Sequence, residues 1–259
     1  MSARVQIEQK LSCTPEQAWL ACAEPSGIRQ WQADQVSGRV VAGGRLELKW
    51  PALGASIELD VVEVRRGERL VLESGRSRVT FELGPGFVRV EHQGIASSDE
   101  LAGTDSAWRT SLALLAHYVE RHRGRSRSVH WVVRRARTTP EAAAEFFSGK
   151  EALGAWLGRT DAAIGMPGSR YELRTLWGEP MTGRVLSRVP GRDLALSWAE
   201  QDDSALVLRT LPSPSASDER LIAACWSRWS GAPASKSSLH GLDAALDNLA
   251  RLLDGAGSA

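Results

Sequence analysis

An internal repeat constrains the fold of this chain more than any other feature of its sequence. The segment Thr14-Pro15-Glu16 recurs as Thr139-Pro140-Glu141, at an offset of 125 residues. Three further pairs keep the same offset: Trp31 with Trp156, Gly43 with Gly168, and Leu48 with Leu173. A constant offset over several positions indicates one fold that is used twice. We therefore expect two domains, residues 1–125 and 129–259, joined by the polar, glycine-containing segment 122–128.

A long amphipathic helix closes each half. In the first half, residues 104–123 carry large apolar side chains four, three and four positions apart: Trp108, Leu112, Leu115 and Val119. The second half repeats this spacing with Leu242, Leu246, Leu249 and Leu253. Such spacing places the side chains on one face of a helix. We expect Thr104 or Asp105 to cap the first helix, and Leu112 and Leu246 to be buried at equivalent points against a sheet.

The segments between these landmarks are predicted to be strands. Apolar and polar residues alternate in stretches such as 57–61 and 79–83, which is typical of half-buried strands. Thr14 and Thr139 each precede a proline, and this pair of residues predicts the start of a short helix. The predicted order, found in both halves, is a strand, two short helices, about six antiparallel strands and one long helix. This order indicates an α+β protein.

Composition argues against several classes of function. The formal net charge of +1 gives no general attraction for nucleic acid, and no apolar run has the roughly 20 residues of a membrane span. Cys13, Cys22 and Cys225 form no CxxC pair and have no histidine at ligand spacing, so we expect no disulfide framework and no metal site. No nucleotide-binding motif is present, and we expect no cofactor. These features favour a cytoplasmic protein.

The stretch from Gly183 to Trp198 resembles a known family. Its pattern GxVxxxxPxxxLxxxW is similar to that of proteins like the activator of the heat-shock-protein-90 ATPase, which belong to the START-like, or SRPBCC, superfamily. The first half carries matching pieces at residues 15–19 and 43–46 and at Trp108. The resemblance implies two helix-grip domains, each an antiparallel sheet curled around a long C-terminal helix with a cavity between them. Members of the superfamily bind lipids, hormones or polyketides, cyclise polyketides, or assist chaperones, so the fold alone leaves the function open.

The two halves differ at positions that would shape such a cavity. Leu242 stands where the first half has Trp108, and Ala144 stands where the first half has Trp19. Because an indole and an isobutyl group leave different amounts of space, we expect the two cavities to differ in volume and in ligand.

Strand alternation and the helix stripes predict which residues line each cavity. In the first half these are Trp50, Leu59, Phe81, Val90, His92 and Trp108. In the second half they are Tyr171, Leu173, Trp198, Trp226 and Leu242. Aromatic walls of this kind suit flat or apolar ligands. His92 ends an apolar alternation and is a conceivable general base, but the sequence places no carboxylate or nucleophile beside it, so we assign no catalytic residue.

Other polar groups near the junction are expected to be solvated. His117 and His122 fall on the polar part of the first long helix, which predicts a surface position. Arginines gather between Arg121 and Arg137, but aromatic residues that would stack on bases are not interleaved with them, apart from Trp131. We interpret this cluster as a solvated surface and expect no nucleic-acid partner.

Three functions remain open, and the first is the leading hypothesis. It is the non-enzymatic binding of a small apolar or aromatic ligand in a helix-grip cavity. The second is a chaperone-linked or stress-related module that binds a protein partner, a hypothesis that rests only on the family resemblance. The third is a polyketide cyclase or aromatase, in which the cavity orients a reactive chain and His92 assists.

Overall fold

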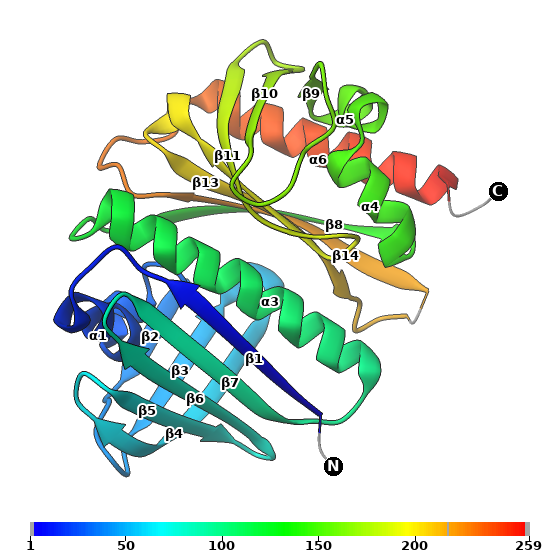
Figure 1. The fold of residues 1–259 in the computed structure, drawn as a ribbon. Helices are drawn as coiled ribbons and strands as arrows, with labels where there is room; N and C mark the ends of the chain where they lie inside the picture. The colour runs from blue at the N-terminus through cyan, green and yellow to red at the C-terminus, as the bar shows by residue number, and fades with distance from the viewer. Residues whose placement is uncertain (1–2, 217, 257–259) are drawn as a thin grey trace. The chain divides into compact units, whose positions relative to one another are not determined.

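The chain divides into two compact units, Met1–Arg127 and Ser128–Ala259. The computed structural model describes residues 3–216 and 218–256. Each unit contains one curled antiparallel sheet and one long helix that follows the last strand of that sheet (Figure 1).

In the first unit, two short helices follow the first strand and a long helix follows the last. The elements are β1 Ala3–Lys10, α1 Pro15–Ala23, α2 Pro25–Ile28, β2 Gln35–Gly38, β3 Arg45–Trp50, η1 Pro51–Leu53, β4 Ala55–Arg65, β5 Arg69–Ser74, β6 Ser77–Gly84, β7 Phe87–Ile95, α3 Ser98–His117 and η2 Tyr118–His122. The seven strands lie in the order β1-β7-β6-β5-β4-β3-β2. Consecutive hairpins therefore build the sheet from β2 to β7, and β1 pairs alongside the last strand.

The second unit repeats this arrangement. Its elements are β8 Ser128–Arg137, α4 Pro140–Ser148, α5 Lys150–Trp156, β9 Gly158–Arg159, β10 Arg170–Thr175, β11 Pro180–Val189, β12 Asp193–Trp198, η3 Ala199–Gln201, β13 Ser204–Pro212, β14 Glu219–Arg228 and α6 Lys236–Ala256. The strand order is β8-β14-β13-β12-β11-β10-β9, which is the order of the first unit counted from β8.

The same local chemistry starts the first helix of each unit. The Thr14 hydroxyl accepts a hydrogen bond from the backbone N–H of Gln17 at 3.3 Å, and the Gln17 side chain accepts one from the N–H of Thr14 at 3.0 Å. Thr139 caps α4 in the same way, accepting from the N–H of Ala142 at 3.2 Å. A proline follows each cap, at a position where the missing N–H has no consequence.

Each long helix packs against its sheet with the face that carries the predicted apolar stripe. Helix α3 packs against β1 and β7, and α6 packs mainly against β8, with further contacts to α4, α5 and β14. Leu112 and Leu246 have no exposed surface, as predicted. Burying a leucine side chain stabilises the folded state by roughly 1.5–3 kcal/mol. The α+β helix-grip fold expected from the sequence is confirmed for both units.

Two expectations about α3 were wrong. The helix begins at Ser98 and not at Thr104, because Ser97 caps it by accepting a hydrogen bond from the N–H of Glu100 at 3.1 Å. The apolar stripe starts later than the helix does, so the stripe alone misplaces the start. His117 and His122 are only 8% and 3% exposed and their rings meet edge to face at 5.1 Å, so they do not lie at the surface. Helix α3 is thus buried on more than its striped face.

Candidate functional site

Strand register defines the inward face of the first sheet, meaning the face turned towards α3. Val61, Leu72, Val79 and His92 lie opposite one another on β4, β5, β6 and β7. Residues that are paired directly across neighbouring strands project from the same face of a sheet. Trp108 of α3 contacts His92, which identifies this face as the inward one.

Three aromatic side chains meet on the inward face of the first unit. The ring of Trp108 stands edge-on to Phe81, with ring centroids 5.6 Å apart, and to His92, with centroids 6.3 Å apart. The indole N–H of Trp108 donates a hydrogen bond to Nδ1 of His92 at 3.1 Å. Val90 lies directly opposite Phe81 and is fully buried beside it. The structure therefore brings four of the predicted site residues together.

The environment of His92 favours its neutral form. Burial lowers the pKa of His92, because the imidazolium would lose its hydration, while the carboxylate of Glu100 acts in the opposite direction. Glu100 accepts a hydrogen bond from the N–H of Ala96 at 2.8 Å and pairs with Arg76 at 3.0 Å, and these contacts hold its pKa below the usual value. The second ring nitrogen of His92, Nε2, is buried and has no hydrogen-bond partner.

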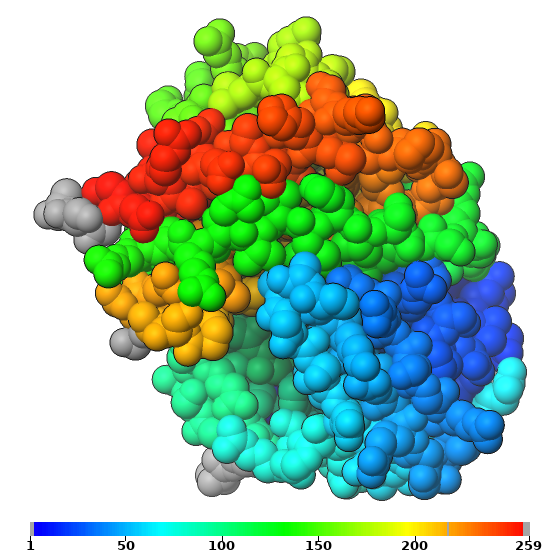
Figure 2. Space-filling view, turned by 180° about the vertical axis from the view of Figure 1, so that it is seen from behind, coloured from blue at the N-terminus to red at the C-terminus, as the bar shows by residue number. Residues whose placement is uncertain are grey.

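The other end of the inward face, on β3 and β4, is partly open. Leu46 lies opposite Leu59, and Leu48 lies opposite Ile57. The two β3 leucines are buried, but Leu59 is only partly buried and Ile57 is 45% exposed. The stretch that contains β3 and β4 lies at the surface of the first unit on the side seen in Figure 2. Apolar side chains on the helix-facing side of the sheet are thus in contact with water here.

Trp50, a predicted site residue, and Ile57, which was not predicted as one, both lie at this end of the face. The indole of Trp50 donates a hydrogen bond to the backbone carbonyl of Gln32 at 3.0 Å, so its polar edge is tied to the loop before β2. Ile57 was not among the predicted site residues, although it alternates in phase with Leu59. That alternation was the signal that would have included it.

In the second unit, all five predicted site residues lie inside one hydrophobic core cluster: Tyr171, Leu173, Trp198, Trp226 and Leu242. None of them is more than 8% exposed. Trp198 and Trp226 stack with centroids 5.2 Å apart, and their polar edges are satisfied internally. Trp198 donates to the carbonyl of Pro180 at 3.1 Å, and Trp226 donates to the hydroxyl of Ser204 at 2.8 Å.

Register shows what replaces the open end of the first unit. Trp226 lies in the row of residues that runs across β11 to β14, at the position that His92 holds in the first sheet. Met181 of β11 pairs with Leu173 of β10, and Ile57 of β4 pairs with Leu48 of β3. Met181 and Ile57 therefore hold equivalent positions in the two sheets. Met181 has no exposed surface, whereas Ile57 is 45% exposed. The inward face of the second unit is therefore covered at the place where that of the first is open.

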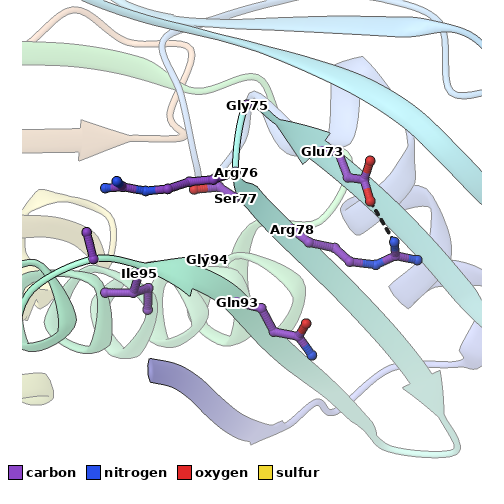
Figure 3. A pocket seen from close by; sticks show the side chains of 9 residues that line it. Glu73, Gly75, Arg76, Ser77, Arg78, Gln93, Gly94 and Ile95 are labelled. Atoms are coloured by element: carbon purple, nitrogen blue, oxygen red, sulfur yellow. Dashed lines mark hydrogen bonds and ion pairs between the residues drawn. The ribbon is translucent and has the colours of Figure 1, made fainter. Parts of the chain in front are cut away.

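An open pocket of about 530 Å³ lies elsewhere on the first unit, where β5 and β7 end and β6 begins. Figure 3 shows that Arg76 and Arg78 extend in different directions from its lining, and Arg78 pairs with Glu73 at 2.6 Å. The charged groups do not converge on one point, and none of the predicted site residues lines the pocket. For this reason we place the candidate ligand site on the inward face and not in this pocket.

Among residues 3–216 and 218–256, no group of three or more His, Cys, Asp or Glu side chains is arranged to hold a metal ion. Within the same residues, no helix has the length and apolar character needed to cross a membrane.

Comparison with protein families gives one match. Residues 12–120 match the model of the family described as Activator of Hsp90 ATPase homolog 1-like protein. This range covers most of the first unit, and for that unit the resemblance seen in the sequence is confirmed. No protein with a curated description matches the chain.

Solved structures include several similar chains. The Aha1 dimer from Colwellia psychrerythraea is 18% identical with a TM-score of 0.43, and the match covers 47% of this chain and 99% of that one. DynU16, from the dynemicin biosynthetic locus, is 17% identical with a TM-score of 0.42, and the match covers 96% of this chain and 98% of that one. CalU16 from Micromonospora echinospora is 21% identical with a TM-score of 0.40, over 46% and 74%. We draw nothing about function from likenesses of this strength.

Proposed function

Taking the first unit as a START-like domain similar to the activator of Hsp90 ATPase homolog 1-like proteins, we propose that it binds a small apolar or aromatic ligand without catalysing a reaction. The site is the inward face of its sheet, where Trp108 of α3 meets β6 and β7, and it extends to the open end of that face on β3 and β4. Phe81 and Trp108 form its aromatic part, and Leu59 and Ile57 form the apolar part in contact with water, several residues further along the sheet.

One observation carries this proposal, namely the exposure of Ile57. An isoleucine on the helix-facing side of a sheet belongs to the core, and its equivalent in the second unit, Met181, is fully buried. Leaving apolar surface in water costs about 25 cal/mol per Å². A ligand that covers this surface recovers that free energy, which is how largely apolar binding sites gain affinity.

The aromatic wall favours a flat ligand. Trp108 and Phe81 meet edge to face, so a third ring can stack on or against either of them. A base role for His92, by which it would assist in the cyclase hypothesis, has no support from its contacts. Its Nδ1 lone pair already accepts the indole N–H of Trp108, so that nitrogen is not free to take a proton from a substrate.

Titration of the full chain with a hydrophobic fluorescent probe tests the proposal. We expect saturable binding to the wild type, weakened roughly tenfold or more by Ile57→Asp, because a carboxylate loses hydration when an apolar ligand covers it. Val62→Asp is the matched control: Val62 is 43% exposed on the same strand but lies at the irregular step of the pairing, outside the inward row. Near-UV circular dichroism checks that both variants fold.

A wild type that shows no saturable binding would contradict the proposal. In that case the protein-interaction hypothesis becomes the better one, and a chaperone ATPase assay with the purified chain is the next measurement. Equal weakening by both aspartate substitutions would place the probe on the outer surface of β4 and would also count against an inward-facing site.

A further inference from the structure

We infer that the ligand carries a hydrogen-bond acceptor, such as a carbonyl oxygen, which pairs with Nε2–H of His92. This inference rests on the proposed function, since it concerns the same inward face. It adds one polar anchor to an otherwise apolar site, and this anchor is a hydrogen-bond donor. The ligand class is then an apolar or aromatic molecule that bears a ketone, quinone or similar oxygen.

The contact between Trp108 and His92 fixes which nitrogen of the imidazole carries the proton. An indole N–H can only donate a hydrogen bond, so the Nδ1 atom that it meets at 3.1 Å must supply a lone pair. A neutral imidazole with its lone pair on Nδ1 has its hydrogen on Nε2. Nε2 is therefore a donor, and it cannot serve as an acceptor in this arrangement.

This donor is the unsatisfied group of the site. Nε2 of His92 is buried and has no hydrogen-bond partner, and a buried N–H without an acceptor is unfavourable. An acceptor atom on a ligand removes this cost when it binds, whereas a ligand with only donors or only hydrocarbon leaves it in place. Because Nε2 has no accessible surface, a neighbouring side chain must shift for the ligand to reach it, while Trp108 keeps its hydrogen bond to Nδ1.

The surroundings of His92 keep it neutral, so that this pattern of donor and acceptor persists. Its direct neighbours on the adjacent strands are apolar: Val79 on β6 and Val5 on β1. The charged group that acts on it is Glu100 of α3, whose carboxylate is engaged by Arg76 and by the N–H of Ala96. The positive form of His92 would lose the lone pair on Nδ1 and with it the hydrogen bond from Trp108.

A pair of probes of nearly equal shape tests this inference. We use 2-acetylnaphthalene, which has a carbonyl, and 2-isopropylnaphthalene, which does not, and we measure the dissociation constant of each for the full-length chain by quenching of tryptophan fluorescence. The ketone is also better hydrated in water, so the useful quantity is the ratio of the two constants compared between variants. His92→Leu removes the donor, and His92→Gln keeps an N–H donor in its place.

We expect His92→Leu to raise the dissociation constant of the ketone relative to that of the hydrocarbon by roughly two- to tenfold, because one hydrogen bond is lost. His92→Gln should restore part of the preference for the ketone. Binding of both probes with the same ratio in the wild type and in His92→Leu would overturn this inference while leaving the proposed function intact. Failure of both probes to bind the wild type would overturn the proposed function, and this inference with it.

Discussion

An imidazole and an indole occupy equivalent places in the two sheets. His92 and Trp226 hold the same position in the row that crosses the four central strands of each unit. The indole of Trp226 is satisfied within its own core by Ser204, whereas Nε2 of His92 has no partner. The satisfied indole of Trp226 contributes to packing, whereas the buried Nε2 of His92 can still take a hydrogen-bond partner.

The lowered pKa of His92 makes the stability of the chain depend on pH. The unfolded chain binds a proton near the usual pKa of about 6.5, but the folded chain does so only at lower pH. The contribution of His92 to the free energy of unfolding is therefore fully present above pH 6.5. It is lost as the pH decreases from 6.5 towards the lowered pKa of the folded chain. We expect urea midpoints at pH 7.5 and 5.5 to lie closer together in His92→Gln than in the wild type.

His240→Gln is the comparison variant for this pH series, because it removes an exposed imidazole of α6 and leaves His92 in place. If the two urea midpoints of His92→Gln lie as far apart as those of the wild type, the imidazole of His92 is protonated equally well in the folded and unfolded chains, and its burial does not disfavour the charged form.

The two gripped leucines should be costly to truncate. Leu112 and Leu246 have no exposed surface, so Leu112→Ala and Leu246→Ala should each lower the free energy of unfolding by about 2–5 kcal/mol. Leu20 on α1 is 43% exposed, and Leu20→Ala should change the free energy of unfolding by no more than about 0.5 kcal/mol. Denaturant unfolding measures all three. An unchanged midpoint for Leu112→Ala would mean that this residue does not hold α3 against its sheet.

At the scale of elements, α6 depends on a glycine for its contact with the β10–β11 turn. A Cβ placed on Gly241 would lie 2.3 Å from the indole of Trp177, so the helix approaches the ring more closely than any other residue would allow. Gly241→Ala should therefore destabilise the protein, although alanine is the better helix former. Gly154 in α5 has open space around it, and Gly154→Ala should stabilise by up to about 1 kcal/mol. Midpoints of thermal unfolding that shift in the same direction for Gly241→Ala and Gly154→Ala would refute this explanation.

The sequence predicted elements better than it predicted contacts. Alternation and repeated landmarks located the strands and the helix stripes, because side-chain periodicity follows directly from backbone geometry. The start of α3 was misplaced, although Ser97 and Glu100 have the spacing of a capping box and could have revealed it. The bond between Trp108 and His92 joins residues from a helix and a strand, and only the folded arrangement of the two elements brings these atoms together.

At the scale of the whole molecule, the chain uses one topology twice with different interiors. The strand orders of the two units are the same, but the second unit fills its inward face with stacked indoles, and the first leaves apolar surface in water. A filled core contributes to stability, whereas an open one leaves room for a ligand. We therefore expect the two units to respond differently to the same small molecule.

Hydrogen exchange measured by mass spectrometry can locate this response. A ligand that binds only the folded form of a site reduces local opening there, by an amount that grows with its concentration relative to the dissociation constant. With saturating 2-acetylnaphthalene, peptides from β3, β4 and the first half of α3 should exchange more slowly. Peptides from β10, β11 and α6 should be unchanged, because the inward face that they form is already covered. Protection confined to the second unit, or equal in both units, would refute the assignment of the ligand site to the first sheet. In Ile57→Asp the protection should disappear while exchange without the probe stays close to that of the wild type.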